Sequence, residues 1–270
     1  MKTKSINFKK YSSFKMGNTF EVALLEDNTQ DWQNYYLIGG CNNILIGNNP
    51  PPMMMLAKKY DFITIENNLL HIGAATPSGK IASFCKKHNI ANFEFLSHLP
   101  GKLGGLVKMN AGLKEHEIFN NLVSITTISG EKQKNSIGYG YRYTDINEPI
   151  LQATFELHYG FDKEKVLMFQ KMRANQPSTP SAGSCFKNPS NEYAGRLIEA
   201  VGLKGLRVGD MAFSQEHANF LVNYGDGQFE DALYLIENAQ ERVYEEFGIK
   251  LELEIEILDK EYLQRLKTKH

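Results

Sequence analysis

Short apolar and β-branched runs, separated by turns that contain glycine, asparagine or proline, fill most of the chain up to about residue 160. Runs of this length and composition are typical of β-strands. The first half is therefore predicted to be rich in sheet. The expected strands lie within residues 19–26, 34–40, 44–48, 61–67, 69–75, 122–130 and 149–160.

One segment of this half follows a helical pattern. The apolar residues that recur on one face within residues 77–90 are Ile81, Phe84, Cys85 and Ile90. Such spacing favours an amphipathic helix. Ser78 precedes the apolar face, and a serine side chain commonly accepts a hydrogen bond from an amide of the first helical turn. We therefore predict a helix here with Ser78 as its N-cap.

The pattern changes to helical periodicity from about residue 163. Helices are predicted within residues 163–176, 192–205 and 229–248, and strands within 218–223 and 250–258. The polar tail, residues 259–270, is predicted to form a short helix. The apolar stripe of the longest helix consists of Leu233, Ile236, Val243 and Phe247. The order of elements predicts an α+β protein with two domains, residues 1–162 and 163–270, that meet without a linker.

Composition narrows the function classes. The chain has 270 residues, 42% of them hydrophobic, and 30 basic against 31 acidic side chains leave a net charge of -1. This balance gives no overall field for nucleic acid or an anionic membrane, so neither is expected as a partner. No segment reaches the roughly 20 apolar residues of a membrane span, and no signal peptide is recognisable, so we expect a cytoplasmic protein. Three cysteines without CxxC spacing predict reduced thiols and no metal site.

Two glycine clusters in the first half are candidate ligand sites. The run LIGGCNNILIG (residues 37–47) contains adjacent glycines that either form a hairpin or turn main-chain amides toward an anion. The run LPGKLGGLVKMNAG (residues 99–112) repeats this composition, which is typical of a main chain that passes close to a ligand. Two such clusters together predict a binding site for an extended, phosphate-bearing cofactor.

Three further motifs carry candidate chemistry, and each has a plain structural alternative. PSAGSCFKNP (residues 180–189) is either a surface turn or a site built from small residues, a cation and an amide. Arg142 lies in YGYRYTD (residues 139–145), which is predicted to be a strand, and either stacks on its neighbouring tyrosines or binds a carboxylate bidentately. Glu252, Glu254 and Glu256 alternate with apolar residues, as on a solvated strand face. The sequence pattern alone leaves these alternatives open.

The order and spacing of these motifs resemble the UDP-N-acetylenolpyruvoylglucosamine reductases, flavoenzymes of bacterial peptidoglycan precursor synthesis. The resemblance extends from YSSFKMG at residue 11 to LELEIEIL at residue 258, and includes AGRLIEAVGLKGLRVGD and HANFLVN. It implies a two-subdomain FAD-binding fold of the vanillyl-alcohol-oxidase/p-cresol methylhydroxylase type, followed by an α+β substrate-binding domain. The subdomains would span about residues 1–55 and 56–162, and the strand 251–258 would contribute to the active site.

The resemblance also implies roles for individual residues. Ser184 would be the proton donor, with Arg142 and Glu254 beside the substrate carboxylate and Glu254 protonated for part of the time. The substrate-binding positions would be Arg173, Asn188, Lys204 and His217. The FAD-binding positions would be Gly39, Gly40, Cys41, Asn42, Asn43, Ile44, Pro100, Gly101, Gly104, Gly105, Asn110 and Gly112. NADPH would be the reductant, although the sequence does not separate it from NADH, and we expect a monomer with a UDP-sugar enolpyruvyl ether as substrate.

The chain departs from the family pattern in several places. A helix of the first flavin subdomain is expected to be missing, because only residues 28–36 connect two predicted strands. Cys41 replaces the third glycine of the first loop, Asn42 a serine, Lys15 an arginine and Leu253 a proline. A flavin oxidase of the same fold, or a binding protein without turnover, remains an alternative to the reductase.

Overall fold

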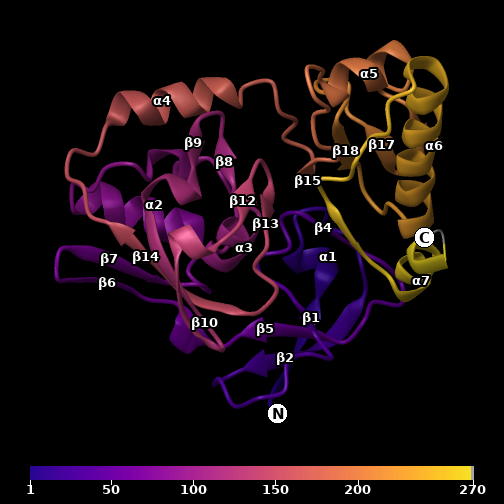
Figure 1. The fold of residues 1–270 in the computed structure, drawn as a ribbon. Coiled ribbons are helices and arrows are strands. Elements are labelled where there is room, and N and C mark those ends of the chain that lie inside the picture. Colours follow the sequence, from indigo (N-terminus) through magenta and orange to yellow (C-terminus); the bar gives the residue numbers. More distant parts are fainter. Residues whose placement is uncertain (269–270) are drawn as a thin grey trace. The chain divides into compact units, whose positions relative to one another are not determined.

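The computed structural model describes residues 1–268, which divide into two compact units (Figure 1). Unit 1 comprises residues 1–4, 22–40 and 53–174, and unit 2 comprises residues 5–21, 41–52 and 175–270. Each unit has its own apolar core. The chain therefore crosses between the units several times, and the early segments 5–21 and 41–52 belong to the same unit as the C-terminal part.

Unit 1 is built around an antiparallel five-stranded sheet of order β11-β10-β14-β7-β6. Its strands are β6 (Ile63–Glu66), β7 (Leu69–Gly73), β10 (Leu122–Thr127), β11 (Gly130–Gln133) and β14 (Ile150–Glu156). The helices of this unit are α2 (Ser78–Lys87), α3 (Leu103–Lys108) and α4 (Lys163–Met172). Side chains such as Ile72, Ile81, Val107 and Phe155 share one buried core, so sheet and helices form a single packed body.

A second sheet has the order β1-β2-β5-β3, and the chain passes from unit 1 to unit 2 inside β1 and back inside β2. The strands are β1 (Thr3–Asn7), β2 (Thr19–Leu25), β3 (Tyr36–Leu37) and β5 (Met53–Leu56), and β5 runs parallel to both β2 and β3. Residues 26–35 contain only turns and bends. The expected connection without a helix is therefore present between β2 and β3.

Two short hairpins complete the strands of unit 1. They pair β8 (Gly112–Leu113) with β9 (His116–Glu117), and β12 (Tyr139–Gly140) with β13 (Tyr143–Thr144). The 3₁₀ helices are η1 (Lys58–Tyr60), η2 (Glu94–Ser97), η3 (Ile118–Asn121) and η4 (Lys134–Ser136). These elements place the loops around the predicted second glycine cluster.

Unit 2 contains an antiparallel sheet of order β15-β18-β17-β16. Its strands are β15 (Ser181–Ser184), β16 (Arg207–Val208), β17 (Met211–Phe213) and β18 (Phe220–Asn223). The helices are α1 (Phe8–Tyr11), α5 (Ala194–Ala200), α6 (Phe229–Phe247) and α7 (Lys260–Thr268). A separate parallel pair joins β4 (Ile44–Ile46) to β19 (Glu256–Leu258), so a segment from early in the chain pairs with its C-terminal part. In Figure 1, α6 runs beside β17 and β18.

The predicted α+β class is confirmed, and a strand or helix lies within each segment for which one was predicted. Three local predictions were wrong. Ser78 is the first residue of α2 and does not cap it, because Pro77 occupies the N-cap position. Phe247 is 37% exposed, although Leu233, Ile236 and Val243 of the same stripe are buried. The strand predicted over 250–258 is regular only in β19, because residues before it bond to another segment.

The final residues 259–270 were predicted to form a short polar helix. Within the described part of the chain this helix is α7, and residues 269–270 lie outside it. Among residues 1–268, the structure contains no helix with the length and apolar character needed to span a bilayer.

Candidate functional site

The segment that carries Ser184 forms an irregular edge of the unit 2 sheet. In the pairing of β15 with β18, Ser181 lies opposite Val222 and Ser184 opposite Phe220, so β15 has one extra residue between the two pairs. Gly183 has a φ of 82° within this bulge. A bulge changes the direction of the following side chain and is common beside active sites. The small residues of PSAGSCFKNP therefore permit a bulge directly before Ser184, which itself pairs with Phe220.

The residues after Ser184 are held between two other segments of unit 2. The main-chain N–H of Cys185 donates to the carbonyl of Asn219 at 2.7 Å. On the other side, the carbonyl of Cys185 accepts from the N–H of Glu254 at 2.9 Å. Phe186 forms a β-bridge with Leu253, and its side chain is fully buried. The structure thus brings Ser184 and Glu254 onto adjacent segments, as the family resemblance requires.

Asn43 and Ile44, in the first glycine cluster, also contact the segment that carries Glu254. The side-chain amide of Asn43 donates to the carbonyl of Glu254 at 2.8 Å, and Ile44 pairs with Glu256. Asn42 donates to the Ser13 hydroxyl at 2.5 Å. These bonds tie the predicted cofactor loop to the segment that carries Glu254. Gly39 and Gly40 of the same cluster belong to unit 1.

Cys41 has the backbone conformation that a glycine would adopt. Its φ is 50°, in the left-handed region that costs an L-residue roughly 1–2 kcal/mol. Its side chain is buried, and the N–H of Ser13 donates to its carbonyl at 3.1 Å. Cysteine at this position therefore adopts a conformation that favours glycine, with its side chain packed in the interior.

Three predicted substrate-binding residues lie in unit 2 around α5. The Asn188 side-chain oxygen accepts from the N–H of Ala194, the first residue of α5, at 3.1 Å. Lys204 forms an ion pair with Glu199 at 3.0 Å. His217 accepts at Nδ1 from the N–H of Asn219 at 3.3 Å, which places the proton of a neutral imidazole on Nε2. Burial lowers the pKa of His217, and the nearby charge of Lys204 lowers it further.

The second glycine cluster lies in unit 1 and surrounds α3, a helix that the sequence did not indicate. A Cβ on Gly104 would come within 3.2 Å of the Ala74 side chain, so glycine permits close packing there. A Cβ on Gly105 would meet nothing within 4 Å. Gly101 has a φ of 152° and follows Pro100. Gly104 therefore allows α3 to pack closely against Ala74, whereas Gly105 faces open space in which a ligand can approach the main chain.

Asn110 and Gly112 shape the end of this cluster. The buried amide of Asn110 donates to Glu117 at 2.8 Å and to the carbonyl of Gly140 at 3.1 Å. Its oxygen accepts from the N–H of Phe119 at 3.3 Å. A Cβ on Gly112 would lie 2.4 Å from the His116 carbonyl, so a larger residue would break the hairpin. Both residues thus fix the local backbone.

A polar ligand fits this region of unit 1. The Nε2 atom of His98 is buried without a hydrogen-bond partner in the loop between η2 and α3. A buried, unpaired polar atom costs about 1–3 kcal/mol, so it is typical of a site that a ligand completes. The loop of His98 continues into Pro100 and Gly101, two predicted FAD-binding positions. The residues present are therefore compatible with a bound dinucleotide.

Arg142 was expected to lie on a strand. It lies instead in the turn between β12 and β13. Its φ is 55°, a left-handed conformation at the second position of the two-residue turn. Its Nη2 donates to the carbonyl of Gly112 at 3.1 Å, and the guanidinium lies 5.1 Å from the Tyr141 ring centroid. The stacked arrangement is thus real, and it also holds the guanidinium next to the second glycine cluster.

Arg173, the remaining predicted substrate residue, is the C-cap of α4 in unit 1. Burial lowers the pKa of its guanidinium. Arg142 and Arg173 thus belong to unit 1, whereas Ser184, Glu254, Asn188, Lys204 and His217 belong to unit 2. The second group therefore lies within one unit, and the convergence of Arg142 with Ser184 and Glu254 stays a prediction.

The three thiols are buried. Burial raises the pKa of Cys85 to about 12. It also raises the pKa of Cys185, and the nearby Glu254 charge adds to this effect. Since thiolates are the reactive form, Cys85 and Cys185 are suited to packing and not to redox chemistry. Among residues 1–268, no group of three or more His, Cys, Asp or Glu side chains is placed to hold a metal ion.

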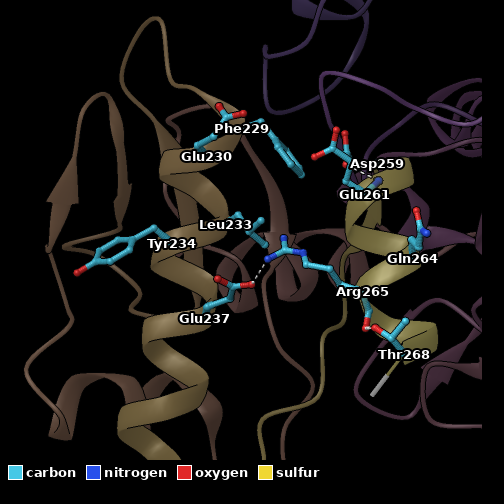
Figure 2. Close-up of a pocket in the computed structure, with 10 residues that line it drawn as sticks. All are labelled: Phe229, Glu230, Leu233, Tyr234, Glu237, Asp259, Glu261, Gln264, Arg265 and Thr268. Carbon is cyan, nitrogen blue, oxygen red and sulfur yellow. Dashed lines mark hydrogen bonds and ion pairs between the residues drawn. The ribbon is translucent and has the colours of Figure 1, made fainter. Parts of the chain in front are cut away.

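The cavity drawn in Figure 2 does not contain any predicted site residue. It lies between α6 and α7, has a volume of about 710 Å³ and opens widely to solvent. An ion pair between Arg265 and Glu237 crosses it at 3.5 Å. Glutamates from both helices line it, which makes it a poor site for a phosphate-bearing ligand.

Sequence reasoning missed Asn219 and His98. Asn219 stands in HANFLVN, which the sequence identified only as a strand motif, and His98 directly precedes the second glycine cluster. The signal for Asn219 was a short amide side chain in an otherwise apolar strand. Such a residue must find hydrogen bonds once it is buried.

The comparisons with known proteins agree with one another. A family model for the C-terminal domain of UDP-N-acetylenolpyruvoylglucosamine reductase matches residues 175–258. Proteins named UDP-N-acetylenolpyruvoylglucosamine reductase are similar over nearly their whole length. That of Campylobacter jejuni (strain RM1221) is 49% identical, covering 94% of this chain and 99% of the relative. That of Helicobacter hepaticus is 46% identical, covering 96% of this chain and 100% of the relative.

A solved structure is also similar. The crystal structure of UDP-N-acetylenolpyruvylglucosamine reductase from Thermus caldophilus superposes with a TM-score of 0.83 at 30% identity. The match covers 96% of this chain and 99% of that protein.

Proposed function

Since the chain belongs to the UDP-N-acetylenolpyruvoylglucosamine reductase family, which consists of oxidoreductases, we propose that it reduces UDP-N-acetylglucosamine enolpyruvate to UDP-N-acetylmuramate. The reaction would serve peptidoglycan precursor synthesis. The observation that supports this proposal is the main-chain hydrogen bond between Cys185 and Glu254, because it joins the segment of the predicted proton donor to the segment of the predicted carboxyl group. The flavin oxidase and the binding protein without turnover are disfavoured by the relatives' names and by this hydrogen bond.

The proposed cofactor is FAD, with NADPH as reductant. When bound, FAD would accept a hydride from NADPH and supply one to the enolpyruvyl methylene carbon. The open surface of the main chain at Gly105, the unpaired Nε2 of His98 and the turn at Cys41 are the parts of this chain that would hold it. The two-subdomain FAD-binding fold and the division at residue 162 belong to the same proposal.

Ser184 would deliver the proton that completes the reduction. Hydride addition to the methylene carbon leaves an enolate, and its adjacent carbon must take up a proton. A serine hydroxyl is a weak acid, but an enolate carbon is basic enough to accept its proton when the geometry is fixed. The bulge at Gly183 redirects this hydroxyl, and the bonds of Cys185 immobilise the segment that follows. General acid catalysis of this kind contributes roughly 10²- to 10⁴-fold.

Arg142 and Glu254 would act on the substrate carboxylate. The guanidinium would stabilise the negative charge that develops in the conjugated carboxylate, and such preorganised donors contribute about 3–4 kcal/mol each. An ionised Glu254 would repel that carboxylate, so we propose that its neutral form donates a hydrogen bond. Arg173, Asn188, Lys204 and His217 would contact the UDP-sugar, with the neutral His217 donating from Nε2.

Flavin spectroscopy on the purified protein tests the proposal. The visible absorbance of oxidised flavin should bleach on anaerobic addition of NADPH and return when the enolpyruvyl substrate is added. A flavin that an alcohol or phenol bleaches and that oxygen, but not the enolpyruvyl ether, restores would instead identify the oxidase. A flavin that NADPH never bleaches would identify a binding protein. Repeating the bleaching with NADH settles the choice of reductant.

A further inference from the structure

Asn219 is a buried amide, 2% exposed, at the start of β18. Its side-chain oxygen accepts from the N–H of Phe186 at 3.0 Å, and its side-chain nitrogen donates to the carbonyl of Phe186 at 2.8 Å. One side chain thus satisfies both main-chain groups of Phe186. The ladder between β15 and β18 ends at the pair of Ser184 and Phe220. Beyond this pair, the side chain of Asn219 provides the two hydrogen bonds that a paired strand would otherwise make to Phe186.

The main chain of Asn219 makes two further contacts. Its carbonyl accepts from Cys185, and its N–H donates to Nδ1 of His217. Asn219 therefore holds the two residues after Ser184 and fixes the orientation of the His217 ring. Its side chain and its main chain act on different partners. A substitution can consequently remove the contacts to Phe186 and leave those to Cys185 and His217 in place.

We propose that Asn219 is a positioning residue for the Ser184 hydroxyl, acting through the main chain of Phe186. The proposal rests on the proposed function of Ser184 as proton donor. Because the ladder is irregular at Gly183, directly before Ser184, the position of Ser184 depends on the bonds of the residues that follow it, and the two side-chain bonds of Asn219 to Phe186 are among these. Without these two bonds, the N–H and carbonyl of Phe186 would seek other partners and the segment would shift.

The first test separates the two half-reactions in the FAD-loaded protein. Reduction of the flavin by NADPH does not need the Ser184 proton, whereas reoxidation by the enolpyruvyl substrate does. We expect Asn219→Ala to slow reoxidation by about 10- to 100-fold, because a displacement of about 1 Å at a reacting group costs this much. Reduction by NADPH should stay within about twofold of wild type.

Asn223 provides a matched control at the other end of β18. It is 3% exposed, its side-chain nitrogen donates to the Phe14 carbonyl at 2.9 Å, and its oxygen accepts from Gly225 and Gly227. Asn223→Ala removes an equally buried amide from the same strand, so it should lower the thermal unfolding midpoint comparably. It should leave the ratio of the two half-reaction rates unchanged. An equal slowing of reoxidation in both variants would overturn the proposal.

Two further measurements sharpen the test, and the second, with Asn219→Asp, keeps it decisive if Asn219→Ala is poorly folded. In a Ser184→Ala background, Asn219→Ala should cause no additional slowing of reoxidation, because its effect passes through the missing hydroxyl. Additive slowing would overturn the proposal. Asn219→Asp should show a defect that lessens as the pH falls, because only a protonated carboxyl can both accept from and donate to Phe186. A pH-independent defect would also count against it.

Failure of the underlying function gives a different result. If the wild-type flavin, once reduced, is not reoxidised by the enolpyruvyl ether, the proposed reaction is wrong, whatever the variants do. If wild type turns over and only the contrast between Asn219→Ala and Asn223→Ala is absent, the reaction stands and the positioning role falls.

Discussion

The main-chain N–H of Glu254 donates to the carbonyl oxygen of Cys185 at 2.9 Å. This bond joins the residue that follows Ser184 directly to the residue with the predicted carboxyl group, although the two are far apart in sequence. The same carbonyl also accepts from Ile255 at 3.4 Å. Neither contact depends on a side chain, so substitutions of Ser184 or Glu254 can test chemistry without breaking the framework.

Ser184→Ala should separate the half-reactions. We expect flavin reduction by NADPH at the wild-type rate and a decrease of roughly 10²- to 10⁴-fold in reoxidation by substrate, because only the second step consumes the hydroxyl proton. Stopped-flow absorbance of the bound flavin measures both steps. Equal losses in the two steps would refute the proton-donor role of Ser184.

Glu254→Gln should retain more activity than Glu254→Ala. An amide can donate the hydrogen bond that we assign to the neutral carboxyl group, whereas a methyl group cannot. The comparison uses the reoxidation rate at saturating substrate. If Glu254→Gln is as slow as Glu254→Ala, the neutral carboxyl is not the working form.

Gly183→Ala should reduce both stability and the reoxidation rate. Its φ of 82° is unfavourable for alanine by roughly 1–2 kcal/mol, although a Cβ there would meet nothing within 4 Å. Relief of this strain would flatten the bulge and turn Ser184 away. Chemical denaturation gives the change in unfolding free energy, and stopped-flow absorbance gives the rate.

Gly248 offers a matched control for that substitution. It caps α6 with a φ of 67°, and a Cβ there would also meet nothing within 4 Å. Gly248→Ala should therefore destabilise the protein similarly and leave reoxidation at the wild-type rate. Comparable rates in the two variants, at comparable losses of stability, would show that the bulge does not aim Ser184.

The sequence predicted most elements of the fold because their apolar spacing is local information. The long stripe of α6 and the strand runs of β7, β10 and β14 are examples. It missed β5, whose PPMMML sequence lacks alternation because the strand is buried. It also missed α3, whose two glycines weaken helix propensity while permitting close approach to Ala74. The distribution of segments 5–21 and 41–52 into unit 2 depends on long-range contacts that no local pattern encodes.

For the candidate site, motif order identified Ser184 and Glu254, and the structure places them on bonded segments. The turn conformation of Arg142 was not predicted, because a strand pattern on both sides hid the two-residue hairpin between them. The two side-chain hydrogen bonds of Asn219 to the main chain of Phe186 were also not predicted, since the partners of a buried amide are set by tertiary structure.

His98→Leu should lower the affinity for FAD without lowering the thermal stability of the apoprotein. The substitution removes a buried nitrogen without a partner and keeps an apolar side chain, so the apoprotein should unfold at the same temperature or higher. Loss of one hydrogen bond to the cofactor should cost about 0.5–1.5 kcal/mol of binding free energy. Flavin fluorescence titration measures the affinity.

His88→Leu is the control for this experiment. His88 follows α2, is exposed and stacks on Phe84. Its substitution should leave FAD affinity unchanged. If His98→Leu binds FAD as tightly as His88→Leu, the unpaired Nε2 is not a flavin contact.

His217 should make stability depend on pH. Burial lowers its pKa, and the charge of Lys204 adds to this, so the folded protein holds a neutral imidazole where the unfolded chain, with a pKa of about 6.5, already binds a proton. The contribution of His217 to the free energy of unfolding is then fully present above that pH. It falls as the pH drops below that value, because the unfolded state binds more protons. Urea unfolding between about pH 8 and pH 5 should show a larger loss for wild type than for His217→Gln, which cannot titrate. Lys204→Gln should reduce the loss by removing the like charge. Parallel curves for wild type and His217→Gln would mean that His217 titrates alike in the folded and unfolded states, and that its predicted role as a neutral donor at Nε2 lacks this support.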